Sequence, residues 1–234
     1  MQKGVPQIMD ITSIKSVLHD LSEEVLPSRF ETAQQPEPNI IQFCLRGINS
    51  QTWIEVSWDS DSARILKINR PEKIGAESTL SKQLRYGLKY MALVTIEQDK
   101  FERVIKFGFA KKPGDEINKY LIFELMGKHS NIFYLDNNQK IIAVGKQINP
   151  NQSSFRIVST GAIYSEPPKN LKKVPSANES YESWKESISS VPESLRYCLI
   201  NTYQGVSPIL TKQLETFSNP VSYTHLTLPT NREV

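Results

Sequence analysis

The chain has 234 residues, of which 38% are hydrophobic and 23% charged, and this composition excludes fibrous and fully disordered proteins. No apolar run approaches the ~20 residues of a membrane span, and the N-terminus lacks the apolar core of a signal peptide, so we expect a cytoplasmic protein without a membrane partner. The net charge of +3 is too small to indicate a class of binding partner, but residues 82–112 carry eight basic and three acidic side chains. That excess fits a phosphate-binding surface and a merely solvated face about equally well.

The first predicted element is an N-terminal helix. Apolar residues recur at helical spacing at Ile11, Ile14, Val17, Leu18, Leu21 and Val25. Asp10 or Thr12 is available as the N-cap, and Pro27 ends the pattern. We therefore expect an amphipathic helix over residues 11–26 that docks on a sheet.

A series of short β-rich runs follows the helix. They cover residues 40–46, 53–58, 64–68, 93–98, 103–109, 120–124, 132–135 and 141–145. Short links rich in Asn, Asp, Ser and Gly predict antiparallel pairing. Leu80, Leu84 and Leu88 predict a helix near residues 79–90 that interrupts the series and carries part of the basic excess, including Lys82 and Lys89. Together these elements predict an α+β domain over residues 1–170.

A linker and a partial helical domain are expected over residues 171–219. Prolines and lysines between Pro167 and Pro175 favour an extended, exposed backbone. Helical patterns follow at residues 179–188 and 191–202. After the break at Gly205, Ser207 and Pro208 supply an N-cap and a first helical residue for a further helix through Leu214.

The last residues do not read as a natural protein sequence. Residues 221–230 match no helical or strand period, and they are the translation of one frame of an adapter used in transposition-based DNA sequencing. The rest of the adapter and its index account for Pro220 and for residues 231–234. We therefore expect residues 220–234 to be a non-native tail and the chain to be the front part of a longer protein.

Enzyme and metal motifs are absent from the sequence. It has no Gly-rich phosphate loop, no GxSxG elbow and no HExxH. Cys44 and Cys198 lie singly in apolar patterns without metal-ligand spacing, which predicts small core residues. We therefore expect a protein that is not an enzyme and that uses no metal or cofactor.

One loop has two open interpretations. Residues 124–131 read Glu-Leu-Met-Gly-Lys-His-Ser-Asn, between one β-rich run and the next. Gly127 favours a turn in which Ser130 and Asn131 bond their own backbone. The same segment could instead hold a phosphate through Lys128, His129, Ser130 and Asn131. The sequence does not decide between a structural turn and a recognition loop.

Arg103 is the second candidate. Strand alternation places it on the same face as Ile105, Phe107 and Phe109, so its guanidinium enters at the rim of an apolar surface. Glu102 and Asp10 are candidate partners. Either the pair is a half-buried ion pair that sets packing, or the arginine binds a phosphate or a stacked base.

These residues carry a family resemblance. The chain resembles the N-terminal region of the NFACT family, ribosome quality-control proteins once called fibronectin-binding protein A. The octet at residues 124–131 is the specific signal, and short matches keep the family's order over about residues 9–168. They are Met9-Asp10, Ala63-Arg64, Leu84-Arg85, Gln98, Glu102-Arg103, Arg156, residues 161–164 and Pro167-Pro168, continuing as residues 205–208 in what resembles the family's helix-hairpin-helix domain.

The resemblance implies a function without nucleotide hydrolysis. The protein would bind a large ribosomal subunit obstructed by peptidyl-tRNA, contact rRNA, and recruit charged tRNA so that the stalled nascent chain receives an untemplated, alanine-rich tail. Family residues for tRNA handling correspond to Asp10, Glu102 and Arg103, with Glu102 replacing the usual Asp. Lys82, Arg85 and Lys89 would attract RNA phosphates independently of sequence.

Two other function classes remain as alternatives. The old family name suggests a fibronectin-binding, adhesion-type interaction module, against which the lack of a secretion signal and of a disulfide framework argues. The family's fold also resembles the N-terminal domain of formamidopyrimidine-type DNA glycosylases. Their catalytic N-terminal residue has no counterpart in Met1-Gln2-Lys3, so glycosylase activity is not implied.

Overall fold

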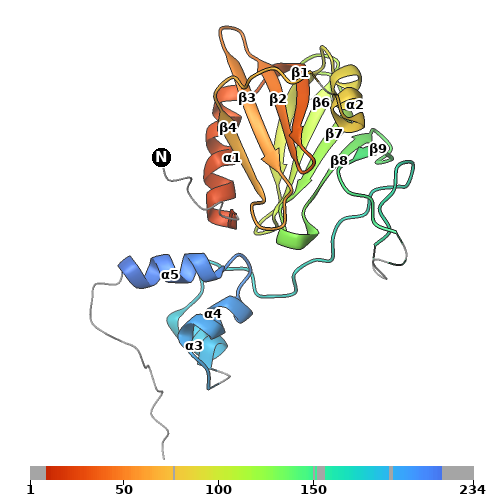
Figure 1. Cartoon of the computed structure of the whole chain (residues 1–234). Coiled ribbons are helices and arrows are strands. Elements are labelled where there is room, and N and C mark those ends of the chain that lie inside the picture. Colours follow the sequence, from red (N-terminus) through yellow and green to blue (C-terminus); the bar gives the residue numbers. More distant parts are fainter. Residues whose placement is uncertain (1–8, 76, 150, 152–155, 190–191, 218–234) are drawn as a thin grey trace, which may run out of the picture. The chain divides into compact units, whose positions relative to one another are not determined.

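The computed structural model describes residues 9–75, 77–149, 151, 156–189 and 192–217 (Figure 1). The chain divides into two compact units, one of Met1–Asp99 with Arg103–Pro168 and one of Lys100–Glu102 with Lys169–Val234. The division after Pro168 falls close to the boundary predicted at residue 170. The predicted adapter tail, residues 220–234, lies outside the described residues.

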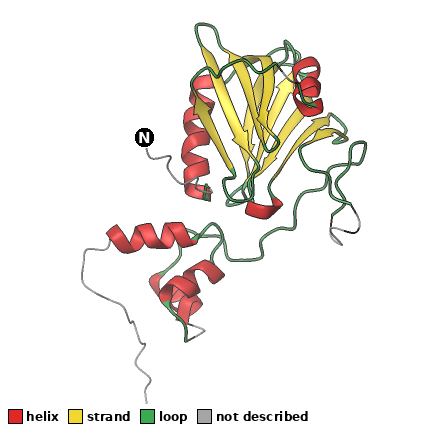
Figure 2. Cartoon of the chain, in the orientation of Figure 1, coloured by secondary structure: helices red, strands yellow, loops and turns green. Residues whose placement is uncertain are grey.

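The described residues of the first unit form a nine-stranded antiparallel sheet in the order β4-β3-β2-β1-β5-β6-β7-β8-β9. Figure 2 shows this sheet in yellow, with helices beside it in red. The strands are β1 Ser28–Glu37, β2 Ile40–Arg46, β3 Gln51–Ser57, β4 Arg64–Ile68, β5 Ala92–Gln98, β6 Val104–Ala110, β7 Ile117–Glu124, β8 Asn131–Asp136 and β9 Ile141–Val144. With the helices beside it, the sheet confirms the predicted α+β class and antiparallel pairing.

The sheet curls so that its two halves pack against each other. Phe43 of β2 stacks on Phe123 of β7 with ring centroids 6.3 Å apart, although three strands separate β2 from β7 in the sheet order. Phe107 of β6 meets Phe123 edge to face at 5.2 Å. Phe30 of β1 likewise meets Phe109 of β6 at 6.1 Å. These rings form the centre of the core.

Helix α1, Ile11–Val25, confirms the predicted N-terminal helix. Asp10 is its N-cap and accepts a hydrogen bond from the Ser13 amide at 2.9 Å. Its apolar stripe of Ile11, Ile14, Leu18, Leu21 and Val25 is buried, as the spacing predicts. Full burial of each such side chain stabilises the fold by ~1.5–3 kcal/mol.

Helix α2, Thr79–Gly87, confirms the helix predicted near residues 79–90, although it ends earlier. Ser78 caps it by accepting a hydrogen bond from the Ser81 amide at 3.0 Å. Leu80, Leu84 and Leu88 are buried in the main core, and α2 packs on β1 and β9. Gly87 allows this approach, because a Cβ there would overlap the Tyr134 ring and hydroxyl.

Strand β1 is the element that the sequence pattern does not predict. Its buried apolar side chains are Phe30 and Ala33 alone, and Pro36 lies near its end. Its register against β2 shifts twice, which obscures the alternation. Pairing with β2 and β5 on both sides supplies the stability that local propensity lacks.

The described part of the second unit contains α3 Tyr181–Ser189, α4 Leu195–Thr202 and α5 Pro208–Phe217. Gly205 between α4 and α5 has φ +74°, and the Ser207 hydroxyl accepts a hydrogen bond from the Leu210 amide at 3.0 Å. The segment predicted as an exposed linker is hydrogen-bonded to α4 and to the residue pair that follows it. Lys173 donates its amide to Thr202 O, and the Gln204 amide donates to Lys173 O, both at 2.9 Å.

We predict that Gly87→Ala lowers the free energy of unfolding by about 1–3 kcal/mol, because the buried Tyr134 must move to admit a methyl group. Helix propensity alone predicts stabilisation of about 1 kcal/mol, so the sign is informative. Urea unfolding followed by circular dichroism measures the change. Gly75→Ala, which meets nothing within 4 Å, is the control. A more stable Gly87→Ala protein would contradict the packing.

Candidate nucleic-acid interface

Helix α2 buries one face against the core and exposes the opposite face, and the exposed face carries basic residues. Leu80, Leu84 and Leu88 fix the orientation of the helix against the core. Lys82 and Lys89 are therefore exposed, as predicted. Arg85 is partly exposed and forms an ion pair with Glu77, which precedes the helix. The structure thus brings the three predicted phosphate-binding cations to one side of α2 and its C-terminal end.

Two tyrosines lie among these cations. Tyr86 is 70% exposed and Tyr90 is 64% exposed. The Lys89 ammonium lies 5.0 Å from the Tyr90 ring centroid, and the Arg29 guanidinium lies 5.7 Å from it. Arg85 lies 5.6 Å from the ring of Tyr86. We call Arg29, Lys82, Arg85, Tyr86, Lys89 and Tyr90 the α2 surface.

The sequence pattern does not by itself assign these aromatic residues to the interface. Tyr86 lies two positions from Leu84 and Leu88, which on a helix is the face opposite the leucines, so a helical projection would have shown its exposure. No local signal marks Tyr90 or Arg29. Exposed aromatic rings beside cations are suited to stack on unpaired bases while the cations meet phosphates.

The loop at residues 124–131 is divided between buried and exposed side chains. The short helix η1, Gly127–His129, forms its turn, with Gly127 at φ +58°. Ser130 is buried and its hydroxyl accepts a hydrogen bond from the Met126 amide at 2.8 Å. Lys128 and His129 are exposed and so are available to a ligand.

Asn131 closes the same loop from the inside. It is buried, it donates to Lys146 O at 2.7 Å, and it accepts from the Lys146 amide at 2.8 Å. Ser130 and Asn131 therefore hold the turn through hydrogen bonds to the backbone, as the interpretation of the octet as a structural turn predicts. A phosphate at this loop would be contacted by Lys128 and His129.

Glu124, the first residue of the octet, is 2% exposed and lies in a buried ion pair. Arg156 donates two hydrogen bonds to its carboxylate at 2.8 and 2.9 Å, and the Tyr164 hydroxyl donates a third at 2.9 Å. Arg156 also lies 5.0 Å from the ring centroids of Phe133 and Tyr164. Burial and the Glu124 carboxylate raise the pKa of Tyr164, so its hydroxyl stays a donor.

Arg103 precedes β6 and is partly exposed, while Ile105, Phe107 and Phe109 on its face are fully buried. This arrangement is the predicted position at the rim of the core. The Leu125 amide donates to Arg103 O at 2.9 Å, so the structure brings Arg103 beside the octet. Glu102 is also partly exposed, and its Oε1 accepts a hydrogen bond from the Asn170 amide at 3.2 Å within the second unit.

Asp10 is only 6% exposed. One carboxylate oxygen accepts from both the Thr12 hydroxyl at 2.8 Å and the Ser13 amide at 2.9 Å. The Met9 amide donates to Ala63 O at 3.1 Å, which fixes this terminus beside the start of β4. These contacts give Asp10 a structural role as the N-cap of α1. A contact with RNA would be a second role.

Two separate surfaces result. Arg103, Lys128 and His129 lie at the end of the sheet where β6 begins and β7 ends, and we call this set the loop end. The last residues of β5 pair with the start of β6 at the loop end, whereas the C-terminal end of α2 leads into the first residues of β5. That strand has seven residues, so the two surfaces are about 20 Å apart along it.

Within the described residues, no cluster of His, Cys, Asp and Glu side chains has the composition of a metal site. Over the same part of the chain, none of the helices combines the length and the apolar character needed to cross a membrane. Cys44 and Cys198 are both buried, which confirms their prediction as small core residues. Burial raises the pKa of Cys44 to about 11.

Comparison with known proteins identifies related chains. A family model described as NFACT N-terminal and middle domains matches residues 10–228. The Rqc2 homolog RqcH of Bacillus subtilis (strain 168) is 26% identical over 199 residues, which cover 83% of this chain and 35% of the relative. That of Streptococcus pneumoniae serotype 2 (strain D39) is 30% identical over 156 residues, which cover 65% of this chain and 28% of the relative. The chain thus spans about a third of the length of these curated relatives.

The fold is shared with a solved structure. The N-terminal domain of the fibronectin-binding protein PavA from Streptococcus pneumoniae superposes with a TM-score of 0.76 at 25% sequence identity. The match covers 89% of this chain and 78% of that domain.

We predict that Arg156→Ala lowers the free energy of unfolding by about 3–5 kcal/mol, because Glu124 is then left as a buried charge without its cation. Urea denaturation at pH 7 measures this loss. The matched control is Lys67→Ala, which removes an exposed partner of Glu24 and is expected to cost less than about 1 kcal/mol. Equal losses in the two variants would show that the Glu124 pair does not stabilise the loop.

Proposed function

Because this chain belongs to the NFACT family, we propose that it acts in ribosome quality control. In this proposal it binds large ribosomal subunits that carry a stalled peptidyl-tRNA. It then recruits charged tRNA for untemplated alanine tailing of the nascent chain. The family match over residues 10–228 carries the proposal, and the basic, aromatic α2 surface gives it a physical basis.

The loop end is the proposed tRNA contact. Arg103 combines a main-chain anchor to Leu125 with a partly exposed side chain, so a guanidinium is held at a rigid strand end. Arg forms paired hydrogen bonds to phosphate oxygens and stacks on bases, and both modes suit a folded RNA. Lys128 and His129 extend the positive surface beside it. The family resemblance also assigns Asp10 and Glu102 to tRNA handling, and we propose that role for them without assigning them a contact with the arginine.

The α2 surface is the proposed rRNA contact. Its cations supply attraction to phosphates, and Tyr86 and Tyr90 supply planar surfaces for exposed bases. Such binding needs no sequence preference. We infer that the chain itself catalyses no reaction and uses no cofactor, because peptide transfer would belong to the ribosome in the cytoplasm.

The alternative is an adhesion-type interaction module. The solved relative PavA is named a fibronectin-binding protein, and this observation favours the alternative. The two functions separate in one experiment on the complete protein that carries this segment. Co-sedimentation with large subunits after translation is stalled supports the ribosomal role. Absence from that fraction together with binding to immobilised fibronectin would support adhesion instead.

We predict that Arg103→Ala in the complete protein reduces the tRNA that co-purifies with it by about 10- to 100-fold, the loss expected for one or two charged hydrogen bonds. Sedimentation with large subunits should persist, because the α2 surface is intact. Arg103→Lys keeps the charge but loses the paired geometry and should give an intermediate yield. Unchanged tRNA recovery from Arg103→Ala would refute the assigned role of this arginine.

We predict that Lys82→Ala with Lys89→Ala weakens binding to unrelated RNA sequences by a similar factor. The slope of log affinity against log salt should become shallower by ~0.7 for each phosphate of single-stranded RNA that the protein no longer neutralises. Filter binding at several salt concentrations measures both effects. The control is Lys15→Ala with Lys140→Ala, which removes two exposed charges from other elements. A salt slope that changes equally in both pairs would exclude a specific contribution of α2.

A further inference from the structure

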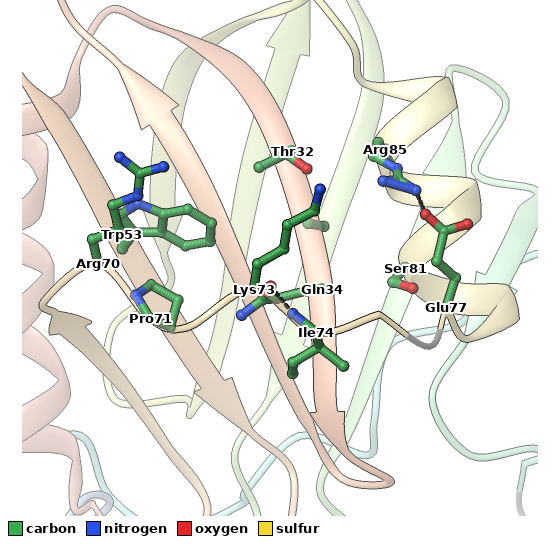
Figure 3. Close-up of a pocket in the computed structure, with 11 residues that line it drawn as sticks. Thr32, Gln34, Trp53, Arg70, Pro71, Lys73, Ile74, Glu77, Ser81 and Arg85 are labelled. Atoms are coloured by element: carbon green, nitrogen blue, oxygen red, sulfur yellow. Dashed lines mark hydrogen bonds and ion pairs between the residues drawn. The ribbon is translucent and has the colours of Figure 1, made fainter.

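A pocket of about 250 Å³ lies on the outer face of the sheet, beside α2 (Figure 3). Residues 70–74, which follow β4, form one side of it. Side chains of β1 form its floor, Trp53 of β3 lies on the same side as Arg70, and Ser81 and Arg85 of α2 close the far side. The pocket lies wholly within the first unit and is distinct from the loop end.

The segment over the pocket is fixed by one amide side chain. Gln34 of β1 donates to Glu72 O at 2.8 Å, and its oxygen accepts a hydrogen bond from the Ile74 amide at 3.3 Å. Gln34 is itself held by Gln42 at 2.9 Å, and Gln42 by Glu55 at 2.9 Å. This row of polar side chains crosses β1, β2 and β3, so the pocket is formed before any ligand arrives.

The lining of the pocket combines cations with an aromatic wall. Figure 3 shows Arg70 and Trp53 on one side, Arg85 with Glu77 on the other, and Lys73 with Gln34 between them. Arg70 and Lys73 are exposed, and Trp53 is partly exposed. Glu77 is the one carboxylate among the lining residues and already pairs with Arg85. Arg70 and Lys73 therefore give the Trp53 side a net positive charge.

These features select a ligand that is both planar and anionic. Trp53 offers a surface on which a flat ring stacks, and stacking of one base on an aromatic side chain contributes roughly 1–3 kcal/mol to binding by alanine substitution. Arg70 and Lys73 are placed to neutralise a phosphate. The Thr32 hydroxyl offers a hydrogen bond to a ring edge or a sugar. The volume suits one such group and excludes a duplex.

We propose that this pocket binds a single ribonucleoside phosphate, either as a free nucleotide or as one unpaired nucleotide of an RNA. The base stacks on Trp53, and the phosphate lies against Arg70 and Lys73. The proposal does not rest on the ribosomal role. Arg103→Ala should reduce tRNA recovery while leaving this pocket unchanged, so failure of one assignment is distinguishable from failure of the other.

The test uses the 234-residue chain and its tryptophan fluorescence. The probes are AMP, adenosine, inorganic phosphate and a single-stranded adenylate hexamer. Trp58 is fully buried and Trp184 is not among the residues that line the pocket, so quenching by a bound base is expected to come from Trp53 and to disappear in Trp53→Phe. AMP should quench, and adenosine should bind at least tenfold more weakly because it lacks the phosphate. Quenching by the hexamer and not by AMP would also support the site and would identify RNA as its source.

Charge variants complete the test. The double variant Arg70→Ala with Lys73→Ala should bind AMP at least tenfold more weakly in isothermal titration calorimetry. Where only the hexamer quenches, the same loss is expected for the hexamer. Lys15→Ala with Lys140→Ala should leave the binding unchanged. Arg70→Lys with Lys73→Arg, which keeps both charges, should retain most of the affinity, and thermal unfolding checks the fold of each variant. The proposal is overturned if neither AMP nor the hexamer quenches, if inorganic phosphate binds as tightly as AMP, or if the alanine pair binds as the parent does.

Discussion

Five phenylalanines of β1, β2, β6 and β7 hold the two halves of the sheet face to face, and the rest of the first unit depends on this contact. They are Phe30, Phe43, Phe107, Phe109 and Phe123, joined by ring contacts of 5.2 to 6.3 Å. Each ring pair adds ~0.5–1.5 kcal/mol beyond the burial of its area. Because strand side chains alternate, fixing these rings inside also fixes which residues face outward. The outward residues and the strand ends carry the candidate sites.

Cations accompany an aromatic ring at both candidate nucleotide-binding places on the outside of this core. On the α2 surface, Lys89 and Arg29 flank Tyr90, and in the pocket Arg70 and Lys73 accompany Trp53. Arg85 belongs to both places. Lysines alone would attract any anion, whereas a ring beside them adds stacking that only a ligand with a flat face can use. For this reason we propose single-stranded nucleic acid, and not an acidic peptide, as the ligand of both places.

Much of the fold is predictable from the sequence because its elements are locally consistent. The spacing of Ile14, Leu18 and Leu21 predicts α1, and the leucines at residues 80, 84 and 88 predict α2. Strand β1 is not predictable in this way, because its polar outer face and its register shifts leave no alternation for a pattern to detect. The same holds for the pocket, whose wall comes from β3 and from a segment some 17 residues later. Only the three-dimensional fold brings Trp53 and Arg70 together.

The octet at residues 124–131 shows why a specific sequence signal need not be a contact surface. Glu124, Ser130 and Asn131 are buried and bonded within the fold, and Gly127 supplies a backbone conformation that other residues rarely adopt. Each of these requirements restricts the residue type, so the sequence is distinctive for structural reasons. Lys128 and His129 are under no such restriction from packing, since they are exposed. Packing therefore does not explain why these two residues lie at the tip of this turn, beside Arg103. Recognition of a phosphate would explain it.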